Sequence, residues 1–171
     1  MNILNVCDSP AWDLVGYQAL HMAARSVKLG HNAAVLCPGG SRLAAECARL
    51  KVQVMPLTLK TKLGFFDSAG WDVVNFYNPD SLNPLLLKKI KAAGSRIFVS
   101  QFKLGSPRAF ERLAQAAPYV TLFLGGCDSV QEEFIVAGLE TRCTFMVPQC
   151  LSIGRWESAM LIKHAMFQNR T

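Results

Sequence analysis

Short apolar runs alternate with segments of helical period along almost the whole chain, and this alternation limits the possible folds more than any other feature. A helix between two strands supplies the long crossover that a parallel pair requires. The pattern therefore predicts one α/β domain, with a doubly wound parallel sheet of six or more strands in a three-layer α/β/α arrangement. The expected strands cover residues 2–7, 33–37, 52–57, 72–77, 95–100, 119–124 and 144–147, and the expected helices cover residues 16–29, 41–50, 81–93, 107–117 and 129–137.

The composition is that of an ordinary globular domain, with 51% hydrophobic residues in a chain of 171. No uninterrupted apolar run approaches the roughly 20 residues that span a bilayer, and the first residues lack the basic start and apolar stretch of a signal peptide. We therefore expect a cytoplasmic protein. The six cysteines are scattered without a C-x-x-C pair, so we expect reduced core residues and neither a metal site nor a disulfide framework.

The net charge of +6 is unevenly placed, because the segment from residue 82 to 110 contains no Asp or Glu. One interpretation is a solvated helix face followed by a loop. The other is a surface that attracts a phosphorylated ligand or makes a peripheral contact with an anionic membrane leaflet. Nucleic acid is not an expected partner, because aromatic residues are not interleaved with the basic ones. The basic residues of this segment are Lys88, Lys89, Lys91, Arg96, Lys103 and Arg108.

Ligands of doubly wound sheets bind at the carboxyl ends of the strands, so the loops after the strands are the places to search. The first of these loops has only Gly16 where a dinucleotide fingerprint needs three glycines, and no glycine pair is followed by the Lys-Ser or Lys-Thr of a phosphate-binding loop. We therefore expect no bound cofactor. Gly39 and Gly40 follow the second expected strand, where a tight turn into Ser41 is favoured over a grip on phosphate.

The candidate ligand-binding residues come from three of these loops. The asparagines can hydrogen-bond hydroxyl groups in both senses, and Lys103 and Arg108 can meet a phosphate. The alternative is structural: Asn78 only begins a turn with Pro79, and Arg108 is a solvated residue at a helix start. The candidates are Asp13, Gly16, Tyr17, Asn75, Asn78, Gln101, Lys103 and Arg108; no residue is assigned a catalytic or metal-binding role.

The order of these pieces resembles the N-terminal, acceptor-side domain of GT-B glycosyltransferases, in particular the subfamily 4-like type, over residues 1 to 150. The resemblance is carried by NILNVCDSPAW, DLVGYQAL and KLGHNAAVLCPGGSRLAAECARLKVQVMPL in the first part, and by WDVVNFYNP and VTLFLGGCDSVQEEFIVAGLETRCTFMVPQC later. It implies a Rossmann-like fold. The sequence departs from the family in lacking a glycine pair in the first loop, where it has Asp13-Leu14-Val15-Gly16, and in having Asn75, Tyr77 and Asn78 where histidines often follow the fourth strand. Near the end, Cys127 stands in place of the serine that opens the late helix, and Leu151 and Ser152 stand in place of the usual glycine and aspartate.

In that family, donor-sugar chemistry depends on a second Rossmann-like domain that carries the nucleotide site and a spaced pair of glutamates. We expect the 171 residues to lack it, and the isolated chain to be inactive. The resemblance therefore implies the acceptor-binding half of a glycosyltransferase, as a fragment or a subunit, with a sugar or phosphorylated acceptor and a catalytic donor-domain partner. The alternative is a non-catalytic binding or scaffold protein that kept the fold. An unrelated flavodoxin-like regulator is disfavoured, because only Asp8 is available where an acidic cluster is needed.

The last segment, residues 155–168, has a broad apolar stripe that includes Trp156, Met160 and Phe167, and no strand follows it. We expect residues 1–154 to form the Rossmann-like domain and residues 155–171 a C-terminal helix that packs on it. The competing idea is that the stripe docks a partner, a second copy or a membrane surface.

Overall fold

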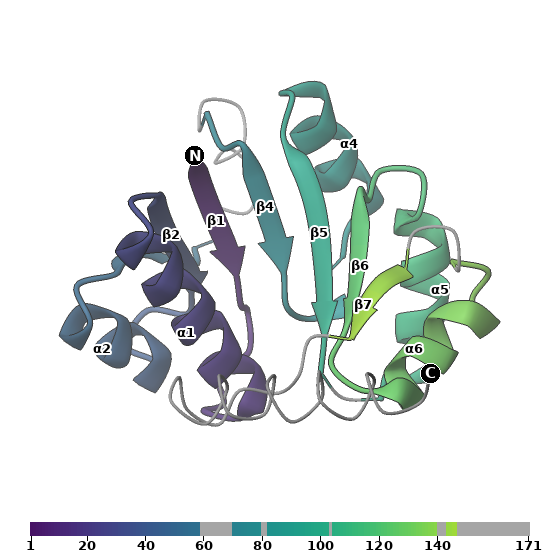
Figure 1. Ribbon diagram of the computed structural model, residues 1–171, viewed down its shortest axis with the longest axis horizontal. Helices are drawn as coiled ribbons and strands as arrows, with labels where there is room; N and C mark the ends of the chain where they lie inside the picture. Colours follow the sequence, from purple (N-terminus) through teal and green to yellow (C-terminus); the bar gives the residue numbers. More distant parts are fainter. Residues whose placement is uncertain (59–69, 80–81, 103, 140–142, 147–171) are drawn as a thin grey trace, which may run out of the picture.

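A computed structural model describes residues 1–58, 70–79, 82–102, 104–139 and 143–146. Its seven strands form one parallel sheet in the order β3-β2-β1-β4-β5-β6-β7, which confirms the predicted doubly wound α/β fold (Figure 1). The strands are β1 (Asn2–Val6), β2 (Asn32–Cys37), β3 (Gln53–Pro56), β4 (Val73–Phe76), β5 (Arg96–Gln101), β6 (Leu122–Gly125) and β7 (Cys143–Met146), and the helices are α1 (Leu14–Lys28), α2 (Arg42–Arg49), α4 (Pro84–Ala92), α5 (Pro107–Ala116) and α6 (Asp128–Val136).

Four of the described helices, α1, α2, α4 and α5, begin where a short polar side chain caps the first turn, whereas Cys127 makes no such hydrogen bond at the start of α6. Ser41, Asn83 and Ser106 accept hydrogen bonds from backbone N–H groups at the starts of α2, α4 and α5. Helix α1 begins two residues earlier than the sequence pattern predicts, at Leu14, because the Asp13 side chain caps it there. The caps therefore fix the starts of α1, α2, α4 and α5 in the segments that follow β1, β2, β4 and β5.

Two hydrophobic clusters lie on the two faces of the sheet. One contains side chains of α1 and α2, and the other contains side chains of α4, α5 and α6. Right-handed crossovers explain this division: the connections from β1 to β3 run one way along the sheet and those from β4 to β7 run the other way. Figure 1 shows α1 and α2 beside β1 and β2, and α5 and α6 beside β6 and β7.

The α1 face of the central strands is partly polar. Leu4 and Val6 of β1 join the apolar cluster beneath α4 to α6, so the alternating residue Asn5 points to the other face. Asn75 of β4 lies opposite Asn5 in the strand register, and its Oδ1 accepts a hydrogen bond of 2.9 Å from Ser100 Oγ in β5. Buried hydrogen-bonding side chains thus occupy the sheet where β1, β4 and β5 run side by side.

The expected boundary between residues 1–154 and 155–171, and the C-terminal helix itself, lie outside the described residues. Within the described part of the chain, no helix combines the length and apolarity needed to cross a bilayer.

Candidate functional site

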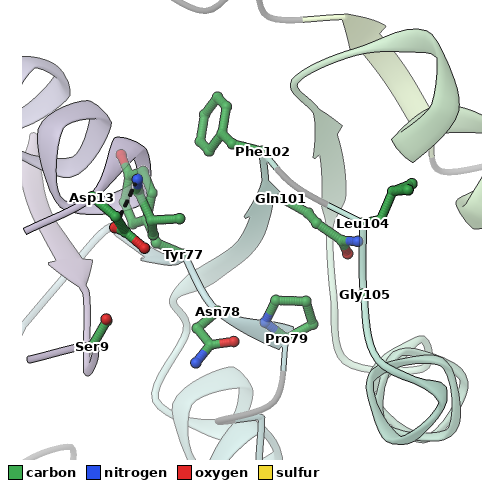
Figure 2. A pocket seen from close by; sticks show the side chains of 10 residues that line it. Ser9, Asp13, Tyr77, Asn78, Pro79, Gln101, Phe102, Leu104 and Gly105 are labelled. Atoms are coloured by element: carbon green, nitrogen blue, oxygen red, sulfur yellow. Dashed lines mark hydrogen bonds between the residues drawn. The ribbon is translucent and has the colours of Figure 1, made fainter. Parts of the chain in front are cut away.

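The sheet order reverses at β1, since the chain passes from β1 to β2 and β3 on one side and returns to β4 on the other. The loops after β1 and β4 therefore leave the sheet in opposite directions, and the crevice between them is where ligands bind in doubly wound sheets. A pocket lies at this point, and its empty space of about 440 Å³ includes the open solvent at its mouth (Figure 2). It is lined by Ser9, Asp13, Val15, Tyr77, Asn78, Pro79, Gln101, Phe102, Leu104 and Gly105.

The first wall of the pocket is the loop between β1 and α1. Asp13 Oδ1 accepts hydrogen bonds from the backbone N–H groups of Val15 at 3.0 Å and Gly16 at 3.2 Å, the first of which is drawn in Figure 2. Ser9 lies in the same loop, and its hydroxyl oxygen accepts a hydrogen bond of 3.3 Å from the N–H of Ala11. This wall therefore brings a carboxylate and a hydroxyl group to the pocket.

The second wall follows β4 and is tied to the first. Asn78 Nδ2 donates a hydrogen bond of 3.2 Å to Asp8 Oδ1, which joins the loops after β4 and β1. The Tyr77 hydroxyl donates to Asn5 Oδ1 at 3.1 Å, and the Tyr77 ring stacks on Phe102 with 6.1 Å between centroids. Burial raises the pKa of Tyr77, so its hydroxyl keeps its proton and remains a donor at neutral pH.

The third wall is the segment that follows β5, and a carboxylate on α6 holds it. Glu133 Oε2 accepts hydrogen bonds from Gln101 Nε2 at 2.6 Å and from the N–H of Gly105 at 3.0 Å. Gly126 lies against Phe102 in the same wall, and its N–H donates to the carbonyl oxygen of Gln101 at 2.8 Å. The third wall is thus anchored to both β6 and α6.

The structure brings three of the predicted ligand-binding residues, Asp13, Asn78 and Gln101, to the same pocket. Asn75 is buried in β4 and hydrogen-bonded to Ser100, so it lies among the sheet residues and does not line the pocket.

The other predicted residues lie elsewhere. Gly16 is inside α1, and a Cβ atom added to it would lie 3.7 Å from the Trp12 ring. The Tyr17 ring contacts the His21 ring, with 4.1 Å between their centroids. Arg108 is exposed in the first turn of α5. Lys103 is outside the described residues.

Several residues of the site were not predicted from the sequence. Tyr77 is the last residue of one expected strand and Phe102 is two residues beyond another. Their positions near strand ends pointed to the site, but aromatic residues also suit a core, so they were not chosen. Glu133 carried no signal: it is 28 residues from Gly105, and only the packing of α6 beside β6 brings the two together.

The chemistry of the described lining residues is that of a site for hydroxyl groups. Their polar side chains are a carboxylate, two amides and two hydroxyl groups, and none of the described lining residues is cationic. Carboxylates accept and amides both accept and donate, which suits the hydroxyls of a sugar. In the described ranges, no group of three or more His, Cys, Asp or Glu side chains is placed to hold a metal ion.

Gly39 and Gly40 form a turn, as the sequence favoured. The N–H of Ser41 donates to the carbonyl oxygen of Pro38 at 3.3 Å, and Gly40 has a φ of 72°, which a residue with a side chain rarely adopts. Ser41 then caps α2 through its hydroxyl oxygen, which accepts from the N–H of Ala44 at 3.2 Å. The turn and the helix cap therefore account for Gly39 and Gly40 without a role in binding phosphate.

Solved structures share this fold. HepE from Anabaena, crystallised in complex with UDP and glucose, superposes with a TM-score of 0.72 and 14% identity over 90% of this chain and 46% of its own. A glycosyltransferase from Rickettsia africae ESF-5 superposes with a TM-score of 0.63 and 13% identity over 84% of this chain and 41% of its own. The chain thus spans less than half the length of either neighbour. No family model and no curated protein matches the sequence.

Proposed function

We propose that this chain is the acceptor-binding half of a glycosyltransferase, with the pocket between β1, β4 and β5 as the acceptor site. The observation that carries the proposal is the pocket itself, where Asp13, Asn78 and Gln101 meet at the point of strand-order reversal. These side chains suit a hydroxylated ligand, and the position is the one at which doubly wound sheets bind ligands.

The structural neighbours support the assignment to this class of enzyme. One is named a glycosyltransferase, and the other was solved with UDP and glucose. Both are more than twice as long as the part that this chain matches. We therefore assign the nucleotide-sugar donor site to a second domain, in the same polypeptide or in a partner chain, because sugar transfer needs both substrates in a closed cleft.

A sugar acceptor fits the pocket better than a phosphorylated one. Recognition of phosphate relies on arginine, lysine or a cluster of backbone N–H groups. Asp13 places a carboxylate in the pocket, and Asp8 accepts a hydrogen bond from Asn78, so the acidic side chains of the described residues oppose an anion there. The basic residues of α4 are on the opposite face of the sheet from α1 and do not line the pocket.

The experiment is a titration of ¹⁵N-labelled protein with methyl β-glucoside and, separately, with UDP, followed by amide chemical shifts. We expect methyl β-glucoside to shift the amides of the lining residues and UDP to leave them unchanged. Asn78→Ala should weaken glucoside binding. Asn32→Ala is the matched control, because Asn32 is an exposed asparagine at the amino end of β2. Shifts confined to the amino ends of the strands, or equal effects of the two variants, would contradict the proposal.

A turnover assay tests whether the donor site lies outside this chain. We expect no hydrolysis or transfer of UDP-glucose by the purified chain above a matched blank, since the donor site is assigned elsewhere. Binding of glucoside without turnover supports the acceptor-half proposal. Turnover by the chain alone, or absence of glucoside binding, opposes it.

A further inference from the structure

The two sides of the pocket differ in polarity. Ser9, Asp13 and Asn78 come from the loops after β1 and β4 and are polar. On the β5 side, Gln101 at the strand end is polar, whereas Phe102 and Leu104, which follow the strand, are apolar. Figure 2 shows Ser9 and Asp13 on one side and Leu104 on the other, next to the amide of Gln101. A ligand that filled the polar side with hydroxyl groups would leave the pocket across an apolar rim.

Leu104 is exposed to an unusual degree for a residue at a pocket. Its exposed fraction is 62%, and Figure 2 shows its side chain beyond the rim, on the side of the loop that is remote from Asp13 and Ser9. Single exposed apolar residues are common on protein surfaces and need no explanation by themselves. Among the residues that the structure describes, Leu104 differs from the other exposed large apolar side chains in that it borders the pocket.

The loop of Leu104 is also held in place. The N–H of Gly105 donates to both carboxylate oxygens of Glu133, at 3.1 Å and 3.0 Å, and hydrogen bonds to a carboxylate are among the stronger ones in proteins. Gly105 is enclosed, since an added Cβ would be 3.0 Å from the Cβ of Ala109 and 3.3 Å from Gln101 Nε2. The backbone next to Leu104 is therefore anchored, and the leucine stays outside the core.

We propose that the ligand of this pocket is amphipathic: a hydroxylated group occupies the polar side, and an attached alkyl or similar apolar group leaves over Leu104. This inference rests on the proposed sugar-binding function and narrows its substrate to glycosides or alcohols with an apolar part. Glu133 is a positioning residue in this scheme, because it acts on the ligand only through the loop that it holds.

The test compares hexyl β-glucoside, used below the concentration at which it forms micelles, with methyl β-glucoside in calorimetric titrations. Partial burial of the longer chain on the leucine should make hexyl β-glucoside bind roughly tenfold more tightly. Leu104→Asn should remove most of this advantage, so that the ratio of the two affinities falls toward one. Leu85→Asn is the matched control, because Leu85 is 74% exposed in α4 and does not line the pocket.

A second pair of variants tests the role of Glu133. Glu133→Ala should reduce the advantage of hexyl β-glucoside and shift the amide signal of Gly105. Glu132→Ala removes the same charge from the neighbouring, exposed position of α6 and should change neither. An equal loss in the two variants would show that only the charge of α6 matters, and would overturn the positioning role.

The outcomes distinguish this inference from the proposed function. If the two glucosides bind equally, the pocket binds sugar but the apolar rim has no role, and the inference is overturned while the proposed function stands. If neither binds, both are overturned. If Leu85→Asn abolishes the advantage as well, or if phosphatidylcholine vesicles bind in a Leu104-dependent way, Leu104 is a general apolar contact and the inference is again overturned.

Discussion

Replacing Gly126 by alanine should displace Phe102, which lines the pocket, and lower the stability of the fold. An ideal Cβ on Gly126 would lie 2.5 Å from Cδ1, 3.0 Å from Cα and 3.2 Å from Cγ of Phe102. Phe102 cannot simply rotate away, because the close atoms include its backbone, and the N–H of Gly126 holds the adjacent carbonyl oxygen of Gln101 at 2.8 Å. Overpacking of this kind costs about 1–3 kcal/mol of unfolding free energy. For a chain of this size, that lowers the melting temperature by about 2–4 °C per kcal/mol.

Gly125→Ala is the control, because it adds the same methyl group one residue away. Its Cβ would meet its nearest neighbour, the backbone N of Gln131, at 3.5 Å, which is ordinary van der Waals contact. We expect the unfolding free energy of Gly125→Ala in urea to stay within about 0.5 kcal/mol of the parent value. We expect Gly126→Ala to lose stability and to bind methyl β-glucoside less tightly. Equal stability of the two variants would refute the argument that Gly126 is required by its contact with Phe102.

Three further predictions concern single side chains. Gly16→Ala should raise stability by up to about 1 kcal/mol in urea unfolding, because the helix has room for the methyl group and alanine favours helix; a loss would mean that the contact is tighter than 3.7 Å. Tyr77→Phe should cost about 1–3 kcal/mol in the same assay, because it leaves the buried Asn5 Oδ1 without its hydroxyl donor; a neutral result would contradict this. Burial raises the pKa of the Cys7 and Cys47 thiols to about 12, so both should stay protonated at pH 8. Peptide mass spectrometry should show that iodoacetamide labels them in urea but not in the folded protein. Rapid labelling of the native protein would count against their burial.

The fold could be predicted because its signals are local. Ser41 and Ser106 stand at helix starts, Gly30 ends α1 with a φ of 79°, and the apolar runs have strand length, so each element is encoded by its own residues. Some boundaries shifted: α4 and β6 begin at Pro84 and Leu122, three residues later than expected. Helix α1 begins two residues earlier than expected, because Asp13 was assigned to ligand binding and not to capping. Asp13 caps the helix and lines the pocket as well.

The site was predicted only in part, because its geometry depends on contacts between distant segments. The sequence indicated that loops after the strands would meet, and Asp13, Asn78 and Gln101 did come together. It could not indicate that Asn75, the next-to-last residue of β4, would be buried and hydrogen-bonded to Ser100. It also could not indicate that Glu133 of α6 would reach Gly105. Such contacts follow from how helices pack on the sheet.

The buried polar side chains on the α1 face have a consequence for folding fidelity. Asn5 and Asn75 lie opposite each other in adjacent strands, and the neighbouring residues Leu4 and Val74 are apolar. A slip of one residue in either strand would turn its asparagine into the cluster beneath α4 to α6, where an unpaired amide costs about 1–3 kcal/mol. Runs of similar apolar residues could otherwise pair in several ways. The asparagines therefore discriminate against misaligned strands while the sheet assembles, before any ligand is present.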